Sequence, residues 1–304
     1  MTIRLSTIQE ESKLLIKKMQ LPDSFASIVD DIYIPLTEII INNKKSEPLF
    51  VSINGAQGTG KSTLTQFLKS LIEIQSGLAV ADISLDDFYL TRKERVQLAN
   101  NIHPLLLTRG VPGTHDINLM ENTIAALRDQ RPCIIPRFDK ATDDRCKESM
   151  WSQYNSDSNK LVDIILFEGW CNNSPEQSAE ELAIPINELE ENEDPDGIWR
   201  NYANEQLGDY HRRIFQYADM SIMLKAPNFN SIYEWRTLQE NKLMKASTNR
   251  DNLKIMSPAE LKRFIQHYER ISRHTLEHLP KTADIVIPIS KNHDINHILI
   301  NQSS

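Results

Sequence analysis

The stretch Gly55-Ala-Gln-Gly-Thr-Gly-Lys-Ser-Thr63 decides the fold of this chain of 304 residues. It fits the pattern G-x-x-x-x-G-K-[S/T], and it stands between an apolar run over 49–54 and a helical pattern over 61–75. Glycines in such a turn let backbone N–H groups converge on phosphate oxygens, and the N-terminus of the following helix adds the positive end of its dipole. We therefore predict that the turn binds the phosphates of a nucleoside triphosphate through Gly55, Ala56, Gln57, Gly58, Thr59, Gly60, Lys61, Ser62 and Thr63.

Further apolar runs predict the other strands of a sheet, because each run is brief and bounded by polar or turn residues: 77–85, 160–167, 220–225 and 283–289. Helical patterns lie between them, over 116–129, 228–245 and 257–279. The last of these begins with Ser257, Pro258 and Glu260, which suit the N-cap and the first and third helical positions. Strands separated by helices predict an α/β fold with a mostly parallel sheet covered on both faces.

Two helical patterns precede this domain, over 6–20 and 23–43. We therefore expect an N-terminal helical extension over residues 1–46 and a single domain over 47–304. Within that domain, residues 172–197 carry nine acidic side chains and no Lys or Arg. A solvated surface loop is the first interpretation of such an acidic segment, and a mobile lid or a partner-binding surface is the alternative.

The composition argues against two classes of protein. The 34 basic and 42 acidic side chains give a net charge of −8, so the chain has no general attraction to nucleic acid or to an anionic membrane surface. No apolar run approaches the roughly 20 residues that span a bilayer. The N-terminus resembles neither a signal peptide nor a transit peptide, and the three cysteines suggest no disulfide framework. We expect a cytosolic protein without nucleic-acid or membrane partners, and its oligomeric state stays open.

Carboxylates follow two of the predicted strands. Asp86 and Asp87 come after the strand over 77–85, and Glu168 follows the strand over 160–167. The carboxyl ends of parallel strands form one edge of a sheet, where α/β proteins bind their ligands. Each acid alone could be a helix cap or part of a solvated turn. Beside a phosphate-binding turn, however, they supply what phosphoryl transfer to a hydroxyl requires, a metal-binding carboxylate and a base.

Two intervening loops mix Arg, His, Lys and Asp, and they suit a small anionic, hydroxylated acceptor. Arginine grips a carboxylate with two hydrogen bonds, while Asp and His bind hydroxyls. The candidate substrate-binding residues are Asp87, Tyr89, Arg109, His115, Asp116, Arg137, Asp139 and Lys140. Asp116 could equally cap the helix that it precedes.

Arg236 lies on the predicted helix over 228–245, and two interpretations of it stay open. Its guanidinium could close over the phosphates and stabilise charge in the transition state. It could instead form a surface ion pair with Glu240, four residues later on the same helix.

Six motifs, in this order, resemble those of the D-glycerate 3-kinase group of P-loop kinases: GAQGTGKST, SLDDFYLT, RGVPGTHD, PRFDKA, FEGW and WRTLQE. This group is related to uridine kinase, phosphoribulokinase and bacterial-type pantothenate kinase. The resemblance covers residues 49–289 and implies the P-loop NTPase fold, a mostly parallel sheet of five strands in the order 2-3-1-4-5. It also implies that Asp86 is the general base, that Glu168 helps Ser62 to hold Mg²⁺, and that Arg236 belongs to a lid helix. The loop over 141–145 is shorter than in relatives and lacks glycine, which bears on acceptor specificity.

The expected function is therefore the ATP- and Mg²⁺-dependent phosphorylation of a hydroxyl on a small metabolite, with D-glycerate as the first candidate. Lys61, Asp86 and Arg236 are the expected catalytic residues. A nucleoside or pantothenate is the alternative acceptor within the same class. From a different class, the alternative is a nucleotide-dependent switch that lacks kinase activity and binds a partner through its acidic segment.

Overall fold

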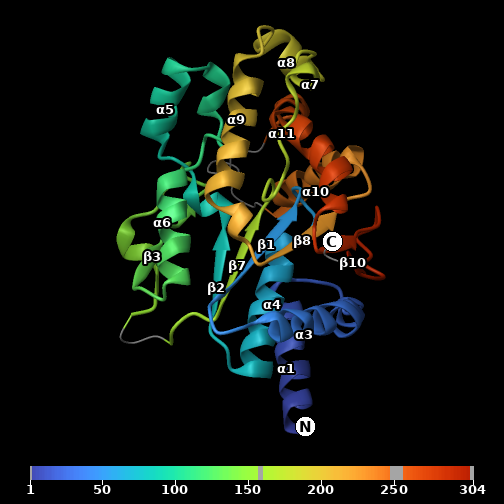
Figure 1. The fold of residues 1–304 in the computed structure, drawn as a ribbon. Helices are drawn as coiled ribbons and strands as arrows, with labels where there is room; N and C mark the ends of the chain where they lie inside the picture. Colours follow the sequence, from blue (N-terminus) through green and yellow to red (C-terminus); the bar gives the residue numbers. More distant parts are fainter. Residues whose placement is uncertain (1, 157–159, 247–255, 302–304) are drawn as a thin grey trace.

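The computed structural model describes residues 2–156, 160–246 and 256–301, so the outer ends of the two predicted domains, residue 1 and residues 302–304, lie outside it. A central sheet runs through the molecule (Figure 1). Its order is β10-β9-β8-β1-β7-β2, formed by β1 (Leu49–Gly55), β2 (Val80–Ser84), β7 (Ile164–Gly169), β8 (Met220–Lys225), β9 (Ile285–Pro288) and β10 (Leu299–Ile300).

The five longer strands are parallel, and numbered along the chain they lie in the order 2-3-1-4-5, which confirms the predicted fold. The sequence did not predict β10, which pairs with β9 in the antiparallel direction. Two residues are too few to establish a strand pattern, so this edge strand depends on the neighbour that it pairs with.

Alternate side chains of the strands enter two separate cores, as the period of a strand requires. In β1, Val51 and Ile53 pack in the first core with residues of the helix α4 (Lys61–Ser76). Phe50, the residue before Val51, points into the second core and stacks on Phe167 of β7 at 6.3 Å between ring centroids. Because both faces are covered, the strands are almost wholly apolar, as the sequence indicated.

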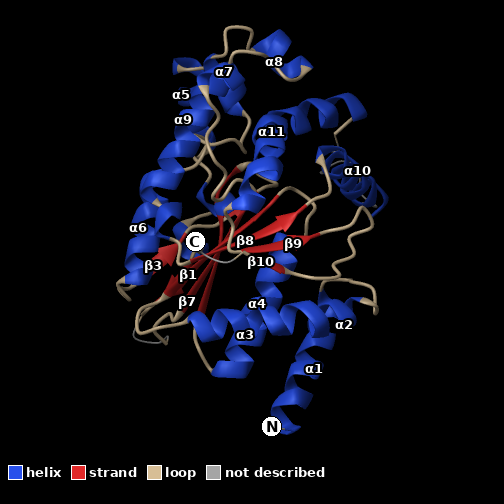
Figure 2. Ribbon diagram, turned by 45° about the vertical axis from the view of Figure 1, so that its right-hand side comes forward, coloured by secondary structure: helices blue, strands red, loops and turns tan. Residues whose placement is uncertain are grey.

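Different helices cover the two faces of the sheet (Figure 2). The first core includes α1 (Thr2–Lys18), α3 (Ile34–Asn43), α4 and α10 (Phe229–Ala246). The second core includes α6 (Ile117–Arg128), α9 (Ile198–Arg213) and one side of α11 (Pro258–His278). The pattern over 23–43 forms α2 (Phe25–Ile28), a π-helical turn over Val29–Tyr33 and then α3, so it is not one uniform helix.

The N-terminal helices pack firmly on the rest of the chain. Ile8, Leu15 and Ile16 of α1 are buried in the first core, where α1 lies against α4. Since α4 begins at the phosphate-binding turn, the extension supports the element that carries Lys61.

The acidic segment differs from the solvated loop that was its first interpretation. It contains α7 (Ala179–Leu182) and α8 (Glu188–Glu193), at the top of Figure 1. Glu190 is fully buried and pairs with Arg270 of α11, with Nη2 and Oε2 2.6 Å apart. Asp194 is also buried, and it pairs with Arg200 of α9. A charge count along the chain could not reveal these pairs, because the arginines that neutralise the two acids lie outside the segment.

The remaining elements were absent from the sequence-based prediction. They are α5 (Arg92–Asn101) and the short strands β3 (Cys133–Ile135), β4 (Phe138–Asp139), β5 (Asp144–Arg145) and β6 (Ser152–Tyr154). The helix α9, described above, was not predicted either. β3 pairs with β6, and β4 pairs with β5 to form a small hairpin that carries Lys140 between its strands. Among the described residues, none of the helices has the length and apolar character needed to cross a membrane.

Candidate active site

The phosphate-binding turn lies between β1 and α4, as predicted. Gly58 and Gly60 have φ angles of +83° and +88°, a conformation that glycine adopts without strain. A Cβ atom on Gly58 would also lie 3.0 Å from Cβ of Trp235, so α10 packs closely against the turn. Lys61 is the first residue of α4, and its Nζ donates to the carbonyl oxygen of Ala56 at 3.2 Å. Its ammonium therefore lies above the turn, at the N-terminus of the helix.

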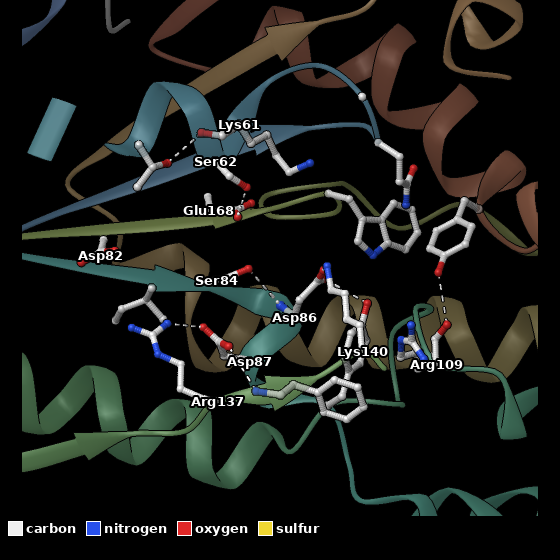
Figure 3. A pocket seen from close by; sticks show the side chains of 18 of the residues that line it. Lys61, Ser62, Asp82, Ser84, Asp86, Asp87, Arg109, Arg137, Lys140 and Glu168 are labelled. Atoms are coloured by element: carbon white, nitrogen blue, oxygen red, sulfur yellow. Dashed lines mark hydrogen bonds and ion pairs between the residues drawn. The ribbon is translucent and has the colours of Figure 1, made fainter. Parts of the chain in front are cut away.

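Ser62 and Glu168 form a pair of oxygen donors beside the turn (Figure 3). The Ser62 hydroxyl donates to Oε1 of Glu168 at 2.9 Å, and the glutamate is only 8% exposed. Among the described residues, none forms an ion pair with this buried carboxylate and no cluster of three metal-binding side chains exists. Mg²⁺ in nucleotide sites takes one or two protein oxygens and completes its shell with phosphate and water. The residues present thus fit such an ion.

A cavity of about 490 Å³ opens at the carboxyl edge of the sheet and contains both Lys61 and Asp86. In Figure 3, Lys61, Ser62 and Glu168 lie on one side of it and Arg109, Arg137 and Lys140 lie on the other, with Asp86 between the two groups. The cavity is thus lined by a phosphate-binding wall and a second, cationic wall.

Both carboxylate oxygens of Asp86 have partners. Oδ2 lies 2.6 Å from Nζ of Lys140, and Oδ1 accepts a hydrogen bond of 2.9 Å from the Tyr89 hydroxyl. Burial acts to raise the pKa of Asp86, but the Lys140 ammonium, the Tyr89 hydroxyl and the more distant Lys61 outweigh it and hold the pKa below its ordinary value. Asp86 is therefore ionised at neutral pH.

Asp87 organises the cationic wall. Its Oδ2 pairs with Nη1 of Arg137 at 2.7 Å, and its Oδ1 accepts from the backbone N–H of Phe138 at 3.3 Å. Arg137 also donates to the Ser152 hydroxyl at 2.9 Å. Burial raises the pKa of Asp87 despite the attraction of Arg137. Its contacts are those of a residue that positions Arg137.

Arg109 is held on the same wall by two kinds of contact. Its guanidinium pairs with Asp143 and lies over the ring of Phe138, 5.5 Å from the centroid. Its backbone carbonyl accepts a hydrogen bond of 3.1 Å from Tyr268 of α11. The arginine is thus fixed in place with its side chain at the cavity.

Three predicted acceptor residues are not among those that line the cavity. Asp116 is the N-cap of α6, since its Oδ1 accepts from the Leu119 N–H at 3.0 Å, which was the alternative interpretation. The Asp139 carboxylate accepts from the N–H of Ala141 and the hydroxyl of Thr142 within its own exposed turn. Local hydrogen bonds of this kind are typical of Asp and compete with ligand binding.

His115 is the third of these residues, and it lies behind the cavity wall. It is 3% exposed, its ring stacks on that of Tyr89 at 4.5 Å, and its Nδ1 lies 2.8 Å from the Tyr210 hydroxyl. Burial lowers its pKa to about 3, so it is neutral at physiological pH. Its contacts are those of a residue that supports Tyr89, which in turn donates to Asp86.

The structure shows the ion pair of the second interpretation of Arg236, and closure over the phosphates stays a prediction. The guanidinium pairs with Glu240 on the same helix, and it also lines the cavity next to Gln239. Its Cζ lies 5.6 Å from the ring centroid of Phe264 in α11. The side chain is thus beside the phosphate-binding turn but bound to its own helix.

Sequence reasoning did not assign a role to several further residues of the cavity wall, notably Trp170, Tyr268 and Phe264. Trp170 follows Glu168 in a motif that the sequence analysis quoted, and its Nε1 donates to the Gly110 carbonyl at 2.8 Å. Tyr268 and Phe264 belong to α11, whose apolar spacing indicates only that one face is buried.

Comparisons with known proteins agree with this geometry. No protein-family model matches the sequence. The chain is 34% identical over 233 residues to the "Uncharacterized kinase mug58" of Schizosaccharomyces pombe, an alignment that covers 74% of this chain and 79% of that protein. It is 29% identical over 222 residues to the "Probable ATP-dependent kinase TDA10" of Saccharomyces cerevisiae, covering 65% and 69% of the two chains.

Among solved structures, a D-glycerate 3-kinase from Cryptococcus neoformans superposes with a TM-score of 0.71 at 22% sequence identity. The superposition covers 89% of this chain and 99% of that one. The chain therefore belongs to the family of ATP-dependent P-loop kinases that includes these two yeast proteins, and it shares the fold of D-glycerate 3-kinase.

Proposed function

We propose that this kinase transfers the γ-phosphoryl group of ATP to a hydroxyl of D-glycerate and that it requires Mg²⁺. The observation that carries the proposal is the composition of the cavity. One carboxylate, Asp86, stands between the phosphate-binding wall and a wall of three cations, Arg109, Arg137 and Lys140. An acceptor that carries a carboxylate beside its hydroxyls would match the cations with its charge and Asp86 with a hydroxyl.

In the mechanism that we propose, Asp86 accepts the proton of the acceptor hydroxyl as that oxygen attacks the γ-phosphorus. The bond from the γ-phosphorus to the bridging oxygen breaks, and ADP leaves with the electron pair. Lys61 and the N–H groups of the turn stabilise the phosphate oxygens, and Arg236 adds a positive charge when it turns from Glu240. Mg²⁺, held by Ser62 and Glu168, would neutralise charge on the β- and γ-phosphates.

The aromatic side chains of the cavity support a small acceptor over a nucleoside. A nucleoside needs a free ring face on which its base can stack. Trp170 and Tyr268 are 4% and 5% exposed and meet edge to face at 4.9 Å. Phe138 is covered by Arg109, and Phe264 contacts Arg236 and Tyr268. These rings therefore contact other side chains of the protein and do not offer a free face to a nucleoside base.

The experiment that tests this proposal measures ADP release from ATP and Mg²⁺ with D-glycerate, L-glycerate, pantothenate or uridine. We expect strong stimulation by D-glycerate, and about a hundredfold loss of kcat in Asp86→Asn with near-normal ATP binding. Stimulation by another acceptor would replace D-glycerate in the proposal. ATP binding without stimulation by any acceptor would favour the nucleotide-dependent switch, and unchanged turnover in Asp86→Asn would remove Asp86 as the base. The cytosolic location and the absence of nucleic-acid and membrane partners stay predictions.

A further inference from the structure

The base that the proposed reaction needs is held in an ion pair in this structure. A carboxylate is a stronger general base when no cation is paired with it, because a paired cation stabilises its ionised form. Oδ2 of Asp86 lies 2.6 Å from the Lys140 ammonium, and Oδ1 accepts a hydrogen bond of 2.9 Å from the Tyr89 hydroxyl. Each oxygen keeps a further lone pair, but the ion pair with Lys140 weakens Asp86 as a base, so Asp86 accepts a proton more readily once a partner has left.

Tyr89 is the partner that stays. It is 4% exposed, and its ring is packed between His115 at 4.5 Å and Phe138 at 5.1 Å. Moving it would open a gap in the closely packed wall behind the cavity, which is costly for an aromatic side chain. The Tyr89 hydroxyl is therefore a fixed donor that orients Asp86.

Lys140 is the partner that can leave. Its side chain is 63% exposed and extends from the turn between β4 and β5. Among the described residues, only Asp86 forms an ion pair or hydrogen bond with its ammonium. The other two cations of this wall each have several partners. Arg137 pairs with Asp87 and donates to Ser152. Arg109 pairs with Asp143 and lies over the ring of Phe138. A flexible lysine with one partner moves at little cost when a second anion is offered.

We propose that Lys140 is a gate on Asp86 that the anionic group of the acceptor opens, an inference that rests on the proposed function. The acceptor carboxylate draws the Lys140 ammonium from Oδ2, and the acceptor hydroxyl then takes its place on that oxygen. The proton moves from the hydroxyl to Oδ2 of Asp86 as the new O–P bond forms and the bond to ADP breaks. Lys140 thus makes activation of the base depend on an anionic acceptor.

The gate has a consequence for specificity. Glycerol has the hydroxyls of glycerate but a CH₂OH group in place of the carboxylate, so it cannot draw Lys140 away. Water in the cavity has no charge either, so the gate protects ATP from hydrolysis when no acceptor is bound. The enzyme would then discriminate between D-glycerate and glycerol through kcat as well as through binding.

Other charged and titratable groups around Asp86 do not replace Lys140. The groups that act on it electrostatically are Lys61, Asp87, Tyr89, His115, Lys140, Cys171 and Tyr268. Burial raises the pKa values of the tyrosines and of the Cys171 thiol and lowers that of His115, so all of these are neutral at pH 7. Asp87 is paired with Arg137. Lys61 and Lys140 are therefore the cations that act on Asp86, and Lys140 is the nearer.

The test compares the full-length wild type with Lys140→Met, which removes the charge and keeps the length of the side chain. Lys147→Met is the matched control, because Lys147 is exposed just beyond the same hairpin and does not line the cavity. Three quantities are measured: ADP release without acceptor, kcat/KM for D-glycerate and for glycerol, and the pH profile of each activity.

In Lys140→Met we expect ADP release without acceptor to rise about tenfold and the ratio of kcat/KM for D-glycerate over glycerol to fall at least about tenfold. The acid limb of each pH profile should move up by about one pH unit, because Asp86 loses the nearby positive charge. Lys147→Met should behave as the wild type does.

A Lys140 that only binds the acceptor carboxylate would give a different result. It would raise KM for D-glycerate, but hydrolysis without acceptor and the acid limb would stay as in the wild type, and this outcome would overturn the gate. Hydrolysis without acceptor does not involve D-glycerate, so that measurement decides the inference even when the acceptor panel contradicts the proposed substrate.

Discussion

The hydroxyl of Ser62, on the first turn of α4, donates a hydrogen bond of 2.9 Å to Oε1 of Glu168, at the end of β7. The two residues are 106 positions apart in the chain. Direct pairing of β1 with β7 brings them together, because it places the phosphate-binding turn and Glu168 at the same edge of the sheet. This pair is the basis of the proposed Mg²⁺ site.

Glu168→Gln should raise the Mg²⁺ concentration that gives half-maximal turnover by about tenfold or more, because the amide keeps the shape but loses the charge. The measurement is ADP release as a function of MgCl₂ at a fixed ATP concentration. ATP binding in the presence of EDTA should not weaken, since the carboxylate repels the metal-free nucleotide and its loss removes that repulsion. An unaltered Mg²⁺ dependence would exclude Glu168 from the metal site.

Lys61→Ala should weaken both ATP binding and turnover, each by about tenfold to a hundredfold, because in the proposed mechanism the ammonium contacts the phosphates before and during transfer. Titration with ATP and a turnover assay measure the two effects. Lys17→Ala, on the exposed side of α1, is the control and should change neither. Normal binding and normal turnover in Lys61→Ala would remove this residue from the mechanism.

Arg270→Met should reduce the free energy of unfolding by about 3–5 kcal/mol, because it leaves the buried Glu190 carboxylate without its partner. Urea denaturation measures the loss. Lys262→Met removes an ion pair with Glu188 between the same two helices, but that pair is exposed, so the change should stay within about 0.5 kcal/mol. Equal losses in the two variants would show that the acidic segment is not anchored by its buried pair.

His115 should make the protein less stable as the pH falls below about 6.5. Its pKa of about 3 in the folded chain is below the unfolded value of 6.5, so the unfolded chain binds the extra proton first. The stability from the neutral ring is complete above pH 6.5 and is lost as the pH falls toward 3. We expect His115→Gln to reduce the slope of unfolding free energy against pH by about 1.4 kcal/mol per unit between pH 4.5 and 6.

Urea denaturation at several pH values measures this slope. His211→Gln, at an exposed position of α9, is the control and should keep the wild-type slope. His267, whose pKa burial lowers to about 4, contributes a similar dependence that remains in both variants. A slope unchanged by His115→Gln would mean that the folded chain protonates His115 without cost.

The fold was predictable because its signals are local. A strand, a glycine turn and a helix follow one another over residues 49–76, and each is specified by its own residues. The cap of α11 is equally local: Ser257 accepts from the Glu260 N–H at 3.3 Å, and Glu260 accepts from the Ser257 N–H at 2.8 Å. The short strands β3 to β6 have no such signal, since they exist only through pairing with each other.

The candidate site was predictable in part for the same reason. Asp86 and Glu168 follow buried strands, so their place at the carboxyl edge follows from the order of elements. His115, Asp116 and Asp139 lie in loops of the same composition as the cationic wall, but their side chains point to other partners. Composition predicts that a loop carries polar chemistry, and it does not predict which side chain faces the cavity.

The sequence alone determined the phosphate-binding turn, the five parallel strands with the helices α4, α6, α10 and α11, and the carboxylates at the strand ends, because each depends on neighbours within a few positions of the chain. Tertiary structure alone decided that Lys140 lies on Asp86, that His115 supports Tyr89, and that Arg270 neutralises Glu190. Each of these contacts joins residues from separate elements. Such contacts depend on packing and on the cost of burying an unpaired charge, and neither can be evaluated until the elements have come together.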